Sequence, residues 1–183
     1  MGQTALHLAL KNDNAGCFQI LAEVSGLDWN LEDDYGDTPL IKAAANGCAV
    51  ILEIILRVPE PQVDFTVINN YGHNVAWCAV LAAGSVVREM EAKEYEDSKR
   101  CIELLTADPR VDWNVRDTDD GDTPLFYGLM VLDLELAKII IKNPSVDLNV
   151  QNDAGEFPET IARLILMMVI LKVNYLSLHC IVL

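Results

Sequence analysis

The apolar residues of this chain fall into short stripes with helical spacing, and the stripes come in pairs. In the most regular pair, Thr38 and Pro39 open a first helix and a second apolar stripe fills residues 49–56. Threonine is a good N-cap, and proline fits the first helical position because no hydrogen bond is lost there. Asn46-Gly47 interrupts the helical pattern between the two stripes. The pattern therefore predicts two short helices preceded by a polar turn.

The same order of parts recurs along nearly the whole chain. The turn glycines Gly2, Gly36, Gly72, Gly121 and Gly155 are 34, 36, 49 and 34 residues apart. Three of them open one helix-start signature, in Gly2-Gln3-Thr4-Ala5-Leu6-His7, Gly36-Asp37-Thr38-Pro39-Leu40 and Gly121-Asp122-Thr123-Pro124-Leu125, and the other two open weaker copies. A related phrase precedes four of them, in Asp28-Trp29-Asn30-Leu31, Asp64-Phe65-Thr66-Val67, Asp112-Trp113-Asn114-Val115 and Asp147-Leu148-Asn149-Val150. This period and this Thr-Pro-Leu-His-like start are typical of ankyrin repeats, and the chain resembles that family.

The resemblance implies an all-α fold with short β-hairpin turns, arranged as a solenoid of helix-turn-helix repeats that each pack only on the next. About four full repeats and a degenerate C-terminal repeat are expected. Their boundaries fall at about 1–35, 36–71, 72–120 and 121–154, with a fifth repeat starting at 155. The repeat array thus covers 1–160, and 161–183 is expected to be a degenerate apolar helix or tail.

The third repeat carries an insertion at 84–99, which makes it 15 residues longer than the regular repeats of 34 residues. The inserted residues are good helix formers, and Glu89 with Lys93 and Glu96 with Arg100 are favourable i,i+4 pairs. We expect an extended, solvated helix that projects past its neighbours. It is either a tolerated surface insertion or a protrusion on which a partner docks.

The run at 161–183 is almost wholly apolar and is long enough to cross a membrane. It contains Arg163, Lys172, Asn174 and His179, however, and charge within a membrane span is costly. A buried last helix pair is therefore favoured over a membrane anchor. A third interpretation is that the run is not the ending that is native to the repeat family.

The chain is strongly acidic, with a net charge of −15 and a sequence pI near 4.4. Nucleic-acid binding needs clustered lysine and arginine, so this composition argues against it and favours either a basic partner or simple solubility. Five cysteines without a Cys-x-x-Cys pair indicate buried, reduced thiols in a cytoplasmic or nuclear protein. No signal-peptide pattern opens the chain.

No catalytic or cofactor motif occurs in the sequence, so we expect a non-catalytic protein without a cofactor. There is no phosphate-binding glycine loop, no His-Glu-x-x-His and no nucleophile elbow. The acidic stretch from Asp117 to Asp122 resembles a calcium loop, but its glycine stands at the fifth position instead of the sixth. Short acidic side chains at this place are better explained as turn and capping residues, and no metal is expected.

His7 occupies the histidine position of the signature, which in the ankyrin family ties neighbouring turns together through hydrogen bonds. Ile41, Trp77, Phe126 and Thr160 stand at the matching places of the later repeats. This departure predicts apolar packing there in place of polar ties between repeats. All three tryptophans are expected in the core, although a partly exposed Trp77 could also anchor a ligand.

The resemblance implies a protein–protein interaction scaffold, in which turn tips and the exposed side of each first helix line a concave groove. Carried onto this chain, the expected partner-binding residues are Glu32, Asp34, Tyr35, Asp37, Ile68, Asn70, Tyr71, His73, Trp77, Arg116, Thr118, Asp119, Asp122, Gln151, Asp153 and Glu156. This acidic set with two tyrosines suits a basic, partly extended segment of another protein. Our hypothesis is that Tyr35 and Tyr71 lie side by side as aromatic anchors.

The expected partner is therefore another protein, with no nucleic acid and no membrane. The chain is expected to act as a monomer or as part of a longer chain, in the cytoplasm or the nucleus. The alternative is a membrane-tethered adaptor that is anchored by the apolar 161–183 run.

Some ankyrin repeats are hydroxylated at the asparagine of an Asp-Val-Asn-like phrase, and Asn30, Asn114 and Asn149 match that position. We therefore expect exposure to an asparaginyl hydroxylase and its co-substrates to add one oxygen at these sites. Intact-mass measurement checks this, and an unchanged mass contradicts it.

Overall fold

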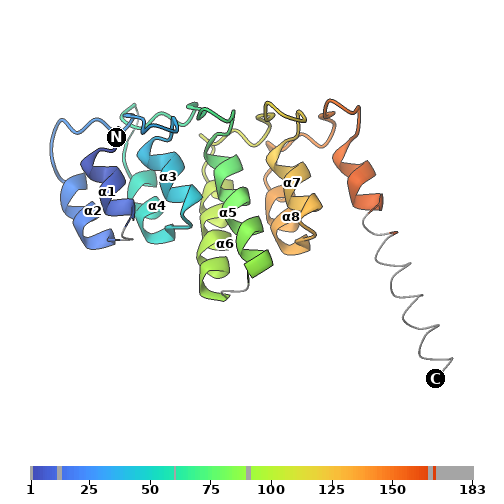
Figure 1. Cartoon of the computed structure of the whole chain (residues 1–183), viewed down its shortest axis with the longest axis horizontal. Helices are drawn as coiled ribbons and strands as arrows, with labels where there is room; N and C mark the ends of the chain where they lie inside the picture. The colour runs from blue at the N-terminus through green and yellow to red at the C-terminus, as the bar shows by residue number, and fades with distance from the viewer. Residues whose placement is uncertain (1, 12–13, 60, 90–91, 165–166, 168–183) are drawn as a thin grey trace, which may run out of the picture.

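The helices stand in a single row of pairs, with every polar turn on the same side of the row (Figure 1). The computed structural model describes residues 2–11, 14–59, 61–89, 92–164 and 167. The helices are α1 (Ala5–Lys11), α2 (Ala15–Ala22), α3 (Pro39–Ala45), α4 (Ala49–Leu56), α5 (Val75–Glu89), α6 (Ala92–Ala107), α7 (Pro124–Met130) and α8 (Leu134–Ile141). A further helical segment covers 158–164. The expected four pairs and a partial fifth are confirmed.

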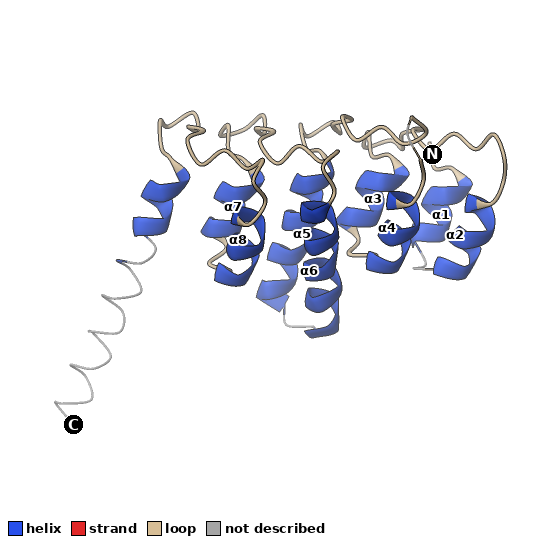
Figure 2. Ribbon diagram, turned by 180° about the vertical axis from the view of Figure 1, so that it is seen from behind, coloured by secondary structure: helices blue, strands red, loops and turns tan. Residues whose placement is uncertain are grey.

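Each pair packs on its neighbours in the row and on little else. The inner helices follow one another as α1, α3, α5 and α7, and the outer helices follow as α2, α4, α6 and α8. The view from behind shows the same order (Figure 2). The expected single-file solenoid is thus confirmed.

The second repeat shows why these residues form a turn and then a helix. The Asp33 amide donates to the Asp37 carbonyl at 2.9 Å, and Gly36 between them has φ +75°. Glycine suits this left-handed position because it has no Cβ. Thr38 Oγ1 then accepts from the Ile41 amide at 3.3 Å and caps α3. Within the described residues these hairpin-like turns contain no β-strand.

The core is one continuous strip between the inner and outer helices. Ala43 and Ala44 are fully buried and keep α3 thin, so neighbouring inner helices approach closely. Ile51 and Ile55 fill the space beneath them from α4. All three tryptophans are buried, as expected. The expectation of buried thiols is wrong for Cys17, which is exposed.

The insertion of the third repeat lengthens both of its helices. α5 has 15 residues and α6 has 16, whereas the other labelled helices have 7 or 8. Both helices extend beyond the neighbouring pairs (Figure 1). The second half of the insertion is not simply solvated, because Tyr95 Oη donates to Asp133 Oδ2 at 2.6 Å and Ser98 is buried. Just after it, Arg100 pairs with Glu53 of α4, so this part of α6 bridges both neighbouring repeats.

The C-terminal alternatives lie mostly beyond the described residues. The helix of the fifth repeat is described to residue 164, and 165–166 and 168–183 lie outside the described ranges. Among the helices that are described, none has the length and hydrophobicity to cross a membrane.

The connection between α7 and α8 contains a non-glycine residue with a left-handed backbone. Leu132 has φ +63°, and the corresponding residue between α3 and α4 is Gly47 with φ +65°. The left-handed region brings Cβ too close to the backbone in L-residues. Leu132 is 58% exposed, so little packing compensates for this strain.

We expect Leu132→Gly to raise the free energy of unfolding by about 0.5–1 kcal/mol, because the left-handed penalty of ~1–2 kcal/mol exceeds the ~0.5–1 kcal/mol entropic cost of glycine. Urea denaturation measures this change. Leu132→Ala is the matched control, since it removes the same exposed side chain but keeps a Cβ and gains nothing. Equal stability of the two variants would contradict the explanation.

Candidate protein-binding surface

The turn tips are joined to one another in a row along one edge of the molecule (Figure 1). The Asn70 amide donates to the Tyr35 carbonyl at 3.0 Å, which links the second and third tips. The Asp153 amide donates to the Asp120 carbonyl at 2.8 Å, which links the fourth and fifth. Backbone bonds of this kind fix the spacing of the tips, so their side chains form one surface.

An aromatic run descends from the third tip to the inner helices. The ring centroids of Tyr71 and His73 are 6.2 Å apart, and those of His73 and Trp77 are 5.0 Å apart, both in stacked geometry. Tyr127 of α7 follows, with its centroid 5.9 Å from that of Trp77 and its ring tilted. Tyr71 is 55% exposed, whereas Trp77 is 2% exposed. The run therefore presents an accessible ring that is supported from below.

Trp77 makes the polar tie that the sequence pattern argued against. Its Nε1 donates at 2.9 Å to the carbonyl of Val115, in the segment that leads into the fourth turn. The prediction of purely apolar packing was wrong here, because the indole combines an apolar body with one donor. Ile41 and Phe126 are buried and apolar at their matching places, as expected. Trp77 is buried and stacks on His73, and its contact with a partner stays a prediction.

His73 lies in an acidic environment that comes from the second and fourth turns. Burial lowers the pKa of His73, and the carboxylates of Asp117, Asp119 and Asp37 oppose this shift. These acids therefore lie within electrostatic range of the aromatic run. Thr118, beside two of them, donates its hydroxyl to the Tyr71 carbonyl at 3.3 Å.

Tyr35 belongs to a separate cluster on the second tip. The Lys42 ammonium lies 5.1 Å from the centroid of the Tyr35 ring and 3.0 Å from both Asp33 Oδ2 and Asp37 Oδ2. Burial works to lower the pKa of Lys42, but the hydrogen bonds to the two carboxylates raise it above its usual value. The rings of Tyr35 and Tyr71 thus have different neighbours. Their placement side by side as anchors stays a hypothesis.

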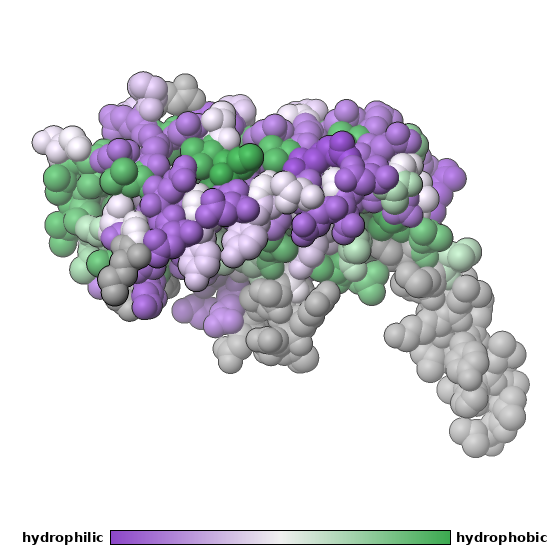
Figure 3. All heavy atoms as spheres, turned by 45° about the horizontal axis from the view of Figure 1, so that its top comes forward, coloured by the Kyte–Doolittle hydropathy of each residue, from purple (hydrophilic) through white to green (hydrophobic). Residues whose placement is uncertain are grey.

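The other predicted partner-binding residues are mostly accessible on the tips. Nine of them are exposed: Glu32, Asp34, Ile68, Asn70, Arg116, Thr118, Asp119, Gln151 and Asp153. Glu156 is half-buried, whereas Asp37 and Asp122 are buried. Arg116 pairs with Asp153 of the next tip. Hydrophilic side chains cover most of the tip-bearing side (Figure 3).

The three candidate hydroxylation sites lie at the bases of the turns. Asn30 Nδ2 donates to the Gln62 carbonyl at 3.0 Å, and Asn30 Oδ1 accepts from the Asp64 amide at 2.8 Å. Asn114 makes the same pair of bonds with its following repeat at 2.8 and 2.7 Å. Polar ties between repeats are therefore abundant and are carried by asparagine. Asn149 is exposed, and hydroxylation stays a prediction for all three.

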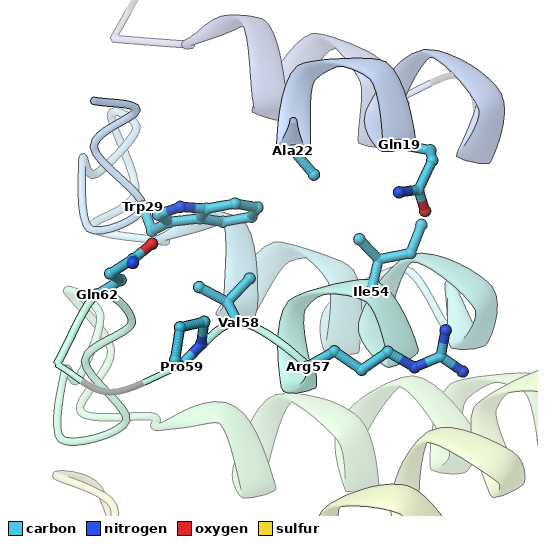
Figure 4. A pocket seen from close by; sticks show the side chains of 8 residues that line it. All are labelled: Gln19, Ala22, Trp29, Ile54, Arg57, Val58, Pro59 and Gln62. Atoms are coloured by element: carbon cyan, nitrogen blue, oxygen red, sulfur yellow. The ribbon is translucent and has the colours of Figure 1, made fainter. Parts of the chain in front are cut away.

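A hollow of about 270 Å³ lies between the outer helices α2 and α4 (Figure 4). The Trp29 ring, Ile54 and Val58 form its apolar part, and Arg57 and Gln62 stand at its rim. No predicted partner-binding residue lines it. Over the described ranges, no group of three or more histidine, cysteine or acidic residues is placed to hold a metal ion.

Comparison with known proteins agrees with this architecture. Residues 1–69 match the family model of ankyrin repeats in three copies. The chain of Bcl-3, described as an ankyrin repeat domain and a member of the IkappaB family, superposes with a TM-score of 0.73 at 19% identity, over 90% of this chain and 66% of that one. The ankyrin repeat protein EF0377 superposes with a TM-score of 0.68 at 24% identity, over 91% of this chain and 80% of that one. The chain thus has the fold of an ankyrin-repeat solenoid, and its first 69 residues match the ankyrin repeat model.

Two curated relatives are much longer than this chain. The neurogenic locus notch homolog protein 1 of Mus musculus is 29% identical over 157 residues, which are 86% of this chain and 5% of that protein. The human NF-kappa-B inhibitor zeta is 27% identical over 159 residues, which are 79% of this chain and 22% of that protein. The chain thus spans only a small part of the length of these relatives.

Sequence reasoning missed two residues of the candidate protein-binding surface, Lys42 and Tyr127. Both stand four residues after the capping threonine of their repeats, at Thr38 and Thr123. An alignment of the repeats at this position would have shown a lysine replaced by a tyrosine on the inner helix. The close contact between the Tyr127 and Trp77 rings could not be found in this way, because it joins two repeats.

We expect Trp77→Phe to lower the free energy of unfolding of the chain by about 1–3 kcal/mol, because it leaves the half-buried Val115 carbonyl without its indole donor. Urea denaturation measures the loss. Trp113→Phe is the matched control, since Trp113 is fully buried but its Nε1 has no hydrogen-bond partner in the described part of the chain. A Trp113→Phe loss as large as that of Trp77→Phe would show that the indole bond contributes nothing.

Proposed function

We propose that this ankyrin array is a non-catalytic scaffold whose acidic tips and inner helices bind a basic, partly extended segment of a partner protein. The observation that carries the proposal is the accessible end of the aromatic run. Tyr71 is exposed there, and Asp117 and Asp119 act on the neighbouring His73. An aromatic face beside carboxylates is a favourable place for a lysine or arginine side chain.

The electrostatics of the tips support a basic partner. Lys42 and Arg116 lie among the tip acids, and each is already held in an ion pair within the chain. The remaining acids leave the tip-bearing side negative, and such a field speeds the association of a cationic segment. The tips stand in a row, so a segment that contacts several of them would have to be extended.

The similar proteins also support the proposal that the ligand is a protein. One of them is named as an inhibitor of NF-kappa-B, and ankyrin repeats are protein–protein interaction modules. We place the function in the cytoplasm or the nucleus. The alternative function, a membrane-tethered adaptor, depends on the 161–183 run, most of which lies outside the described residues.

The proposal is tested by selecting a phage-displayed library of random peptides on the whole chain at low salt. We expect the selected peptides to be rich in lysine and arginine and to bind more weakly at moderate salt, because salt screens exposed charges. Changing Tyr35 and Tyr71 together to alanine should weaken a selected peptide by at least ~1–2 kcal/mol.

Isothermal titration measures these affinities, with Ile20→Ala as the matched control because Ile20 is 69% exposed on the outer helix α2. Selection of peptides without a basic bias would contradict the proposed partner chemistry. If the double tyrosine variant binds with unchanged affinity, the hypothesis that Tyr35 and Tyr71 are aromatic anchors is wrong.

A further inference from the structure

The hollow between the outer helices α2 and α4 has an apolar end and a polar end. Figure 4 shows Trp29 and Val58 at one end, and Gln19 and Arg57 at the other, on either side of Ile54. No predicted partner-binding residue of the tips lines it. The hollow is therefore a surface separate from the tips, and its two ends suit different chemical groups.

A matching hollow of about 290 Å³ lies between α6 and α8, two repeats further along the chain. The two hollows can be compared residue by residue when Trp29 is aligned with Trp113 and Gly36 with Gly121. Glu103, Thr106, Ile139, Lys142 and Asn143 of the later hollow then correspond to Gln19, Ala22, Ile54, Arg57 and Val58 of the first. Differences between the hollows can thus be assigned to single residues.

The later hollow is bridged by a hydrogen bond that the first hollow lacks the side chain to make. Asn143 Nδ2 donates to the Thr106 carbonyl at 3.0 Å, which ties the end of α8 to the end of α6. Val58, at the place of Asn143, has no donor for such a bond. Trp29 lines the first hollow, whereas Trp113 is fully buried and does not line the later one. The apolar end is thus open only in the first of these two hollows.

The interface between α4 and α6 also has its aromatic residue covered. Phe65 follows Asp64 as Trp29 follows Asp28. The Arg110 guanidinium lies 4.1 Å from the centroid of the Phe65 ring and donates to the Leu56 carbonyl at the end of α4 at 2.9 Å. In both later interfaces, a side chain of the following repeat therefore reaches the last turn of the preceding outer helix.

The polar end of the first hollow carries a charge that its lining does not balance. In the later hollow, Glu103 and Lys142 have opposite charges. Gln19 stands at the place of Glu103, so Arg57 is the one charged residue among the described residues that line the first hollow. On a chain with a net charge of −15, this end therefore offers a local site for an anionic group.

Arg57 is accessible to such a group. Its side chain is 79% exposed, and its Nη2 lies 3.8 Å from Glu53 Oε2. The other oxygen of the same carboxylate is held by Arg100 of α6. An exposed ion pair at this distance contributes little to stability. A carboxylate of another molecule can therefore compete for the Arg57 guanidinium.

We propose that this hollow binds an acidic segment of a second partner protein. An apolar side chain of that segment enters the end beside Trp29 and Val58, and a neighbouring aspartate or glutamate pairs with Arg57. Arginine holds a carboxylate through two parallel hydrogen bonds, and the Gln19 amide is a further donor at this end. The inference goes beyond the proposed function and does not depend on it, because the tips select a segment of opposite charge.

The probe is the dipeptide N-acetyl-phenylalanyl-glutamate amide, titrated into the full chain and followed by NMR. We expect saturating shifts of the Trp29 indole N–H and of the Gln19 side-chain amide. The phenylalanyl-glutamine analogue, which has the same shape without the charge, should bind about tenfold more weakly, the equivalent of ~1.4 kcal/mol. Absence of saturating shifts with millimolar probe, or equal affinities of the two dipeptides, would overturn the proposal.

Two substitutions bring features of the later hollow into the first. Gln19→Glu places an acid beside Arg57 and should weaken the probe about tenfold, because it supplies the guanidinium with a carboxylate from the chain itself. Gln151→Glu makes the same change on another exposed glutamine and should leave the affinity unchanged. Val58→Asn supplies the bridging amide of the fourth repeat and should abolish binding. Equal affinities of the two glutamate variants would contradict the site.

The charge of Arg57 is tested with a control from the matching hollow. Arg57→Gln should weaken the probe about tenfold, whereas Lys142→Gln, the equivalent change between α6 and α8, should not alter its affinity. Both residues are exposed, so neither change disturbs the core. Equal effects of the two variants would show that the probe senses only the overall charge and would overturn the proposal.

The two proposals can fail separately. Changing Tyr35 and Tyr71 together to alanine should leave the affinity of the dipeptide unchanged, because neither residue lines the hollow. A loss of affinity in that variant would place the dipeptide on the tips and overturn the second site. A dipeptide that does not bind, together with a library that yields basic peptides, would overturn the second site and leave the scaffold standing.

Discussion

The solenoid depends on hydrogen bonds that cross from each buried turn to the next. Asn69 binds Asp37, Asn152 binds Asp122, and His7 donates from Nε2 to the Asp37 carbonyl at 2.9 Å. A buried polar group without a partner costs more than a paired one contributes, so these bonds impose one register between neighbours. Apolar packing alone would allow the helix pairs to slide, because a hydrophobic contact has little directionality.

The candidate binding surface arises where single repeats depart from this common frame. His73 and Trp77 replace the acid and the apolar residue of the second repeat, and they create the aromatic run. Tyr127 replaces the lysine of the second repeat, and its ring packs against that of Trp77. The frame tolerates these changes because its hydrogen bonds run largely through the asparagines and the backbone. Local departures from a consistent pattern are where functional groups are expected.

The long third repeat adds rigidity at the centre of the row. Tyr95 binds the N-cap acid Asp133 of α8, and Arg100 binds Glu53 of α4. α6 therefore contacts the outer helices on both of its sides. His73 and Trp77 of the aromatic run belong to this same repeat, so two of its rings are carried by a helix pair that is tied to both neighbours.

The sequence by itself determined the helix pairs, their order and the turns, because each of these depends on residues that lie close together along the chain. Gly36, Thr38 and Pro39 act within one turn and the start of its helix, so their effect can be predicted from the amino-acid sequence alone. It also identified the acidic tips. Only the tertiary structure decided that Trp77 forms a polar tie, that Tyr71 and Tyr35 have different neighbours, and that the second half of the insertion is braced. The Trp77 and Tyr95 bonds each join groups that are 38 residues apart in the chain, and the distance between such groups is set by stacking and not by any local pattern.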